Sequence, residues 1–159
     1  MERDVAALPA AQVGDMLIAV PYVPYTGAEL AQIASGGKLV LLDDFGYGNS
    51  FLEYIGMPVR FDNAPLLDPL FNYKNEYFPR ILDFNAGVTA SGIKVVAFNH
   101  GSALSGAAPS QGLAWSSSTS FLDTNGSGNR EPRELQGPFV LAASISLGAG
   151  TVGWSLTPR

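Results

Sequence analysis

The residues able to do chemistry gather in two short loops of this 159-residue chain. One loop is DDFGYGN, which starts at Asp43, and the other is FNHGSAL, which contains Ser102 and the only histidine, His100. A hydroxyl, an imidazole and a carboxylate together supply a nucleophile, a general base and a group that orients the base. However, nucleophile and base normally come from different loops, and the G-x-S-x-G elbow is absent. A degenerate or unconventional hydrolase or amidotransferase that uses His100 with Ser102 or an aspartate is therefore the alternative hypothesis.

The paired acids Asp43 and Asp44 are better explained as structural groups. Neighbouring residues of a strand point to opposite faces, so the two carboxylates cannot work together as an acid and a base. The glycines that follow allow close backbone approach, but two carboxylates repel an anion. We expect one aspartate to accept hydrogen bonds from amides of its own loop and Asn49 to cap a helix that runs to Tyr54.

The same loops hold the candidate ligand-binding residues. The leading hypothesis is a non-catalytic domain that binds a small polar ligand or a protein partner with residues 21–26, 43–49 and 99–105. Three tyrosines in these loops have the amphipathic rings that suit such a contact. The predicted binding residues are Tyr22, Tyr25, Asp43, Asp44, Tyr47, Asn49, Asn99 and His100. One histidine and no cysteine predict no metal site and no cofactor.

Five apolar runs predict the strands that position these loops. Because the runs are continuous and do not alternate with polar residues, they favour strands buried on both faces, as in a parallel sheet. Thr26 and Glu29 have the spacing of a capping box and predict a helix between the first two strands. The prediction is a flavodoxin-like three-layer α/β sandwich with a mostly parallel sheet, in which the edge near 139–155 is open to antiparallel pairing. The predicted strands are 16–20, 38–42, 93–98, 112–116 and 139–146.

Two further segments have a distinct composition. Four prolines between 58 and 79 interrupt every long period, which predicts a crossover of short strands and turns. Residues 116–137 are rich in serine, glycine and asparagine, which is typical of an exposed loop.

Composition limits the class of protein. With 47% hydrophobic and 14% charged residues, the chain predicts one domain over residues 1–159. A net charge of −5 and scattered basic residues argue against a nucleic-acid partner. No run reaches the roughly 18 apolar residues of a membrane span, so no direct membrane insertion is expected in this segment. A third hypothesis is a module that forms homo-oligomers, which would expose a large apolar patch on the single chain.

Four motifs resemble a known family: GGKLVLLDDFGYGNSFLEYIG, FNHGSAL, SSSTSFLDTNGSG and ELQGPFVLAASISLGAGTV. Over residues 13–152 they look like an uncharacterised, largely archaeal, prokaryotic group of class I glutamine amidotransferase-like domains. In that superfamily an elbow carries the catalytic cysteine, but the equivalent residues 44–46 include no thiol.

The resemblance therefore implies a non-catalytic domain, loosely related to auxiliary parts of ABC-type transport and gliding systems. It favours an extracytoplasmic domain of an anchored protein, with a cytoplasmic location as the alternative. The chain departs from the family pattern at residues 151–159, where a terminal acidic loop is missing or replaced.

Overall fold

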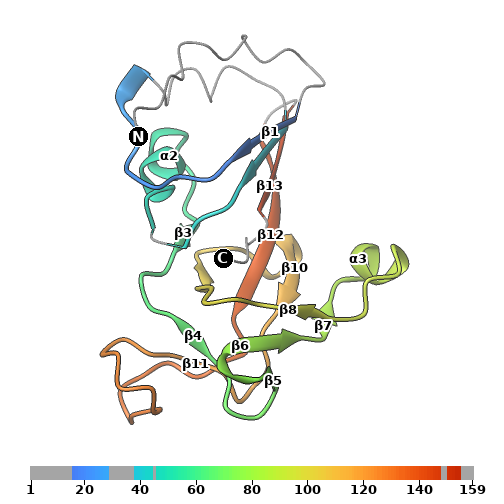
Figure 1. The fold of residues 1–159 in the computed structure, drawn as a ribbon. Helices are drawn as coiled ribbons and strands as arrows, with labels where there is room; N and C mark the ends of the chain where they lie inside the picture. Colours follow the sequence, from blue (N-terminus) through green and yellow to red (C-terminus); the bar gives the residue numbers. More distant parts are fainter. Residues whose placement is uncertain (1–15, 29–37, 45, 148–149, 155–159) are drawn as a thin grey trace.

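The computed structural model describes residues 16–28, 38–44, 46–147 and 150–154. Strands dominate this part of the chain, and its α-helices with assigned bounds are the short α2 (Asn49–Tyr54) and α3 (Ala86–Ala90). Figure 1 shows the strands arranged along an elongated molecule, with β1 and α2 at one end and β5 and β6 at the other.

An eight-stranded sheet runs through most of the described chain. Its main path has the order β1-β2-β13-β12-β10-β7, and β9 pairs with both β12 and β3. The pairs β1–β2 and β2–β13 are parallel, whereas every other pair in this sheet is antiparallel. The strands are β1 (Met16–Ala19), β2 (Lys38–Leu41), β3 (Arg60–Phe61), β7 (Asp83–Phe84), β9 (Leu104–Ser105), β10 (Gly112–Trp115), β12 (Val140–Leu147) and β13 (Gly150–Trp154).

Two smaller antiparallel sheets complete the fold. The first joins β4 (Leu66–Leu67) to β11 (Phe121–Leu122). The second, which we call the β6 sheet, has the order β5-β6-β8, with β5 (Asn72–Tyr73), β6 (Asn75–Ile81) and β8 (Val96–Ala97). A 3-10 turn at Pro109–Gln111 precedes β10.

The predicted flavodoxin-like sandwich is therefore wrong. Four predicted strands are present as β1, β2, β10 and β12, but parallel pairing is confined to β1, β2 and β13. A continuous apolar run indicates burial but does not specify the direction of the neighbouring strand, which depends on the connection. Here the proline-rich crossover folds into short antiparallel strands. The helix predicted after Thr26 lies mostly outside the described residues.

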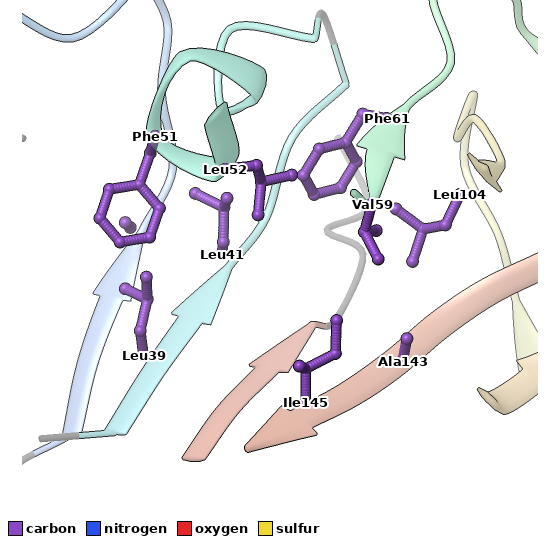
Figure 2. Close-up of a cluster of buried hydrophobic side chains, with 10 residues drawn as sticks. Leu39, Leu41, Phe51, Leu52, Val59, Phe61, Leu104, Ala143 and Ile145 are labelled. Carbon is purple, nitrogen blue, oxygen red and sulfur yellow. The ribbon is translucent and has the colours of Figure 1, made fainter. Parts of the chain in front are cut away.

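Two clusters of buried side chains form the core. In the first, Figure 2 shows Phe51 and Leu52 of α2 lying over Leu39 and Leu41 of β2. The second cluster includes Ile81, Phe98 and Leu141 and lies behind the β6 sheet. Strand β12 contributes Ala143 and Ile145 to the first cluster and Leu141 to the second.

Candidate functional site

Asp43 organises the loop that follows β2. Its side chain is 1% exposed, and its two oxygens accept hydrogen bonds from Gly46 N at 3.0 Å and Gly48 N at 2.5 Å. A Cβ at Gly48 would lie 2.9 Å from Leu41 Cδ2 and 3.0 Å from Asp43 Oδ2, so a larger residue here would force these side chains to shift. The structural interpretation of Asp43 is confirmed, and the amides that an anion would need already have an internal acceptor.

Asn49 does not cap α2, contrary to the sequence-based prediction. Gly48 is the N-cap, and the Asn49 side chain bonds to the backbone of β3 instead. Its Nδ2 donates to Phe61 O at 2.9 Å, and its Oδ1 accepts from Phe61 N at 2.8 Å. An amide side chain has one donor and one acceptor side by side, so it pairs with a peptide group as a neighbouring strand would. Asn49 therefore fastens α2 to β3.

The remaining candidates of this region occupy different environments. The loops 21–26 and 43–49 follow parallel neighbours, and Leu42 N donates to Ala19 O at 2.9 Å, so the structure brings these two loops to one sheet edge. Tyr22 is 69% exposed, while Tyr25 packs against the first cluster. Asp44 and Tyr47 are half-buried.

His100 belongs to the β6 sheet rather than to that edge. Its backbone N–H donates to Tyr77 O at 3.0 Å, and its ring stacks on Tyr77 with centroids 5.3 Å apart and an interplanar angle of 22°. Phe78 meets the same ring edge-on at 5.2 Å. Its Nδ1 is 2.6 Å from Asn99 Oδ1. The backbone at His100 is left-handed, with φ of 54°, which lets the chain leave the strand sharply at this point.

Ser102 has a backbone role. It is 3% exposed, and its hydroxyl lies at hydrogen-bonding distance from the carbonyl oxygens of Asp62 and Ala64. Within the described residues no hydrogen bond joins Ser102 to His100, so the serine pairing of the hydrolase alternative is not formed here. That alternative stays a prediction. Beside Ser102, burial raises the pKa of Asp62, and a hydrogen bond from the Ser105 side chain lowers it in part.

The prediction of an exposed loop over residues 116–137 is confirmed for most of 124–136, but Ser116 and residues 120–123 are buried. Hydroxyls of this segment serve a buried carboxylate, because Asp68 accepts from Ser117 Oγ at 2.5 Å and from Thr119 Oγ1 at 2.9 Å. Asp68 also accepts from the backbone amides of Leu70 at 3.0 Å and Phe71 at 2.9 Å. Serine has the same appearance in a sequence whether its hydroxyl bonds to water or to a buried acid. Asp68 thereby fixes the turn that enters the β6 sheet.

Glu134, which lies within the segment itself, accepts hydrogen bonds from its neighbouring backbone. Its oxygens accept from the backbone amides of Glu131 at 3.0 Å and Thr124 at 2.8 Å. The hydrogen bond from the Glu131 amide lowers the pKa of Glu134, and together with the hydrogen bonds from Thr124 it outweighs the raising effects of desolvation and of the nearby Asp123.

The feature that sequence reasoning missed is an exposed apolar surface on the β6 sheet. Among the described residues, seven of the thirteen exposed large hydrophobic side chains lie between 70 and 96, which concentrates them on this one sheet and the turns beside it. The members of this β6-sheet surface are Leu70, Phe71, Tyr73, Leu82, Ile93, Val95 and Val96.

Strand register explains how these side chains come together. Arg80 pairs with Ala97, and continuing that antiparallel register places Leu82 opposite Val95. Arg80 N also donates to Phe71 O at 2.8 Å, so Phe71, directly before β5, lies beside Arg80 on the other side of β6. Ile81 pairs with Val96, so these two share the opposite face, where Ile81 packs into the second cluster while Val96 stays 38% exposed at the edge.

The prediction that residues 93–98 form a buried strand is wrong. Residues 91–97 are all exposed, and only Phe98 turns inward. Strand β8 covers Val96–Ala97 alone. Among the described residues, the apolar side chains from Ile93 to Val96 therefore do not enter either core cluster.

Neither a metal centre nor a membrane helix is found in the part of the chain that the structure describes. No three histidine, cysteine, aspartate or glutamate side chains there are grouped to hold a metal ion. Nor is any helix in the same ranges long and apolar enough to cross a bilayer.

Comparison with known proteins shows the fold only. No protein-family model matches the chain, and no curated protein is significantly similar to it. A solved structure described as "mmIFT52 N-terminal domain" is similar with a TM-score of 0.62 and 17% sequence identity over 87% of this chain. This chain spans 64% of that chain's length, less than two thirds. The resemblance to amidotransferase-like domains of archaeal type is thus wrong, since the fold shared with mmIFT52 is rich in antiparallel strands, and the location which that resemblance implied loses its basis.

Proposed function

We propose that this chain is a non-catalytic protein-binding domain and that its partner covers the β6-sheet surface. The observation that carries the proposal is the exposure of residues 93–97, which belong to the segment 93–98 whose composition predicts a buried strand. Contiguous apolar surface of this kind marks interaction sites on folded proteins.

The side chains beside β8 offer a useful amount of binding free energy. Leu82, Ile93, Val95 and Val96 are 38–52% exposed. At about 1.5–3 kcal/mol for complete burial of each aliphatic side chain, covering the remaining area is worth roughly 3–5 kcal/mol. Association consumes part of this gain, so these residues would act as the centre of an interface that also needs polar contacts.

A protein suits this surface better than a small ligand. Small ligands are held in concave sites that enclose most of their area, whereas the seven side chains of the β6-sheet surface are 38–71% exposed on the single chain. At the other candidate location, the amides of Gly46 and Gly48 already donate to Asp43. The fold comparison adds that a domain of a larger protein, mmIFT52, has a similar structure.

Site-specific photo-crosslinking tests this proposal. A benzophenone amino acid replaces Val95 in the full chain, and the matched control carries it at Tyr54 on α2, since the two residues are 47% and 53% exposed. We expect a protein adduct of defined mass at Val95 and none at Tyr54 in cells of the source organism. The purified partner should then bind Val95→Ser protein at least tenfold more weakly than Tyr54→Ser protein. Equal adducts at both positions, or none at Val95, would contradict the proposal.

A further inference from the structure

We infer that the partner contributes an extended segment, with acidic residues alternating with apolar ones, which pairs with β8 as an added strand. This inference rests on the proposed function and specifies the chemistry of the partner. Three observations support it: the free edge of β8, the basic side chains of the β6 sheet and its turns, and the conformation of Lys74.

Strand β8 is an edge in the described structure. It ends the order β5-β6-β8, and its neighbour on one side is β6. Phe98 N donates to Pro79 O at 2.8 Å and His100 N to Tyr77 O at 3.0 Å, so these amides point toward β6. In an antiparallel ladder alternate residues direct their backbone groups to opposite sides. The N–H and C=O groups of Val95 and Ala97 therefore point away from β6, where an added strand would pair.

This edge has little protection against pairing. Proteins usually shield free edges with charged side chains, prolines or bulges. Here Lys94 is the only charged residue between 91 and 98, and none of those residues is proline. An exposed, apolar edge of this kind is the template for β-strand addition, in which backbone hydrogen bonds supply affinity and the side chains on one face supply specificity.

The charges around the edge favour an acidic partner. Lys74, Arg80 and Lys94 are exposed, whereas the acids of residues 70–97 are the half-buried Glu76 and the exposed Asp83. Three cations against two acids give this region a charge of +1, although the whole chain carries −5. Acidic side chains of a partner would thus be attracted to this region and repelled by the rest of the molecule, which orients the approach.

A second copy of the chain fits less well. A symmetric dimer brings the same patch from each copy together, so Arg80 and Lys94 would meet the cations of an identical patch. Like charges across paired strands are destabilising. Each copy also carries the overall charge of −5.

Lys74 occupies a backbone position at which glycine would make the folded chain more stable. It lies in the turn between β5 and β6 with a φ of 78°, a left-handed conformation that glycine adopts without cost. For a residue with a side chain this conformation costs roughly 1–2 kcal/mol. The ammonium group lies 5.3 Å from the centre of the Tyr73 ring, at the end of the β6-sheet surface. A charge retained at such a position is consistent with a role in binding.

Synthetic octapeptides test the inference directly. The first probe alternates aspartate and glutamate with valine and isoleucine, the second replaces the acids by lysine, and the third is the acidic peptide with alternate backbone amides methylated. We expect the acidic probe to shift the NMR amide signals of Val95 and Ala97. The lysine and methylated probes should bind at least tenfold more weakly, and the Arg80→Glu/Lys94→Glu variant should bind the acidic probe at least tenfold more weakly than the wild type does.

Several outcomes would overturn the inference. Equal binding of the methylated probe would exclude strand pairing, and equal binding of the lysine probe would exclude charge selection. No shift at Val95 and Ala97 with the acidic probe would exclude this edge. A concentration-dependent dimer that Val95→Lys dissociates would make a second copy the occupant. In the first three cases a crosslink from Val95 to a distinct protein would still stand, so failure of the inference differs from failure of the proposed function.

Discussion

Replacing Asp68 should destabilise the chain more than any exposed acid does, because four donors converge on its carboxylate. Asp68→Ala removes the acceptor for the Leu70 and Phe71 amides and for two hydroxyl groups. The hydroxyls of Ser117 and Thr119 are 2.8 Å apart and can still bond to each other, but the amides lose their partner. At about 1–3 kcal/mol for each of the two amides left unsatisfied, the cost is roughly 2–6 kcal/mol.

This loss is large beside the ~5–15 kcal/mol that stabilises a typical domain. Asp68→Asn keeps one oxygen for the two amides, so its free energy of unfolding should fall between those of the wild type and Asp68→Ala. Urea denaturation with a constant m-value measures the three values. The exposed Asp83→Ala control should lie within about 0.5 kcal/mol of the wild type. If Asp68→Ala also fell within about 1 kcal/mol, the carboxylate would not hold the turn as described.

Three further predictions concern single residues. Lys74→Gly should raise the free energy of unfolding by about 1 kcal/mol in urea denaturation, because glycine adopts the left-handed backbone without strain. The same variant should bind the acidic peptide more weakly. A lower free energy of unfolding would contradict this prediction. The raised pKa of Asp62 means that its ionisation is less favourable in the folded chain than in the unfolded chain, so the wild type loses stability as the pH rises from 3.8 through the folded pKa. Asp62→Asn does not ionise, so its stability advantage over the wild type should grow over the same pH range. Urea titrations at pH 3.5 and 7 measure the difference. Leu52→Ala in the first cluster should cost about 2–5 kcal/mol in the same assay, and a loss below 1 kcal/mol would show that α2 is not packed on β2.

Local patterns predicted the elements better than their arrangement. The runs beginning at Met16 and Lys38 are strands, and the helix through Tyr54 is present as α2. The hydrogen bonds from the loop amides to Asp43 were also predicted, because an aspartate followed by glycines commonly accepts hydrogen bonds from nearby backbone amides. These features depend on interactions between residues close in sequence.

Features that depend on distant residues could not be predicted in this way. Asp68 and Thr119 are 51 residues apart, and Asn49 and Phe61 meet across a helix. The run 93–98 shows a different difficulty. Its apolar composition indicates that burial of these side chains is favourable, but it does not indicate whether this chain or a partner buries them. A sequence pattern cannot distinguish a core strand from a surface that a partner covers.

Strand β12, which contributes to both core clusters, links the β6-sheet surface to the rest of the chain. Its Leu141 lies behind the β6 sheet, while its Ala143 and Ile145 contact the cluster beneath α2. Fraying at either end would therefore disturb the same strand, so the two ends should resist proteases together. A bound partner at 100 times its dissociation constant adds about 2.7 kcal/mol to the folded state. That gain would slow amide hydrogen exchange in α2, although the partner touches only the opposite end of the molecule.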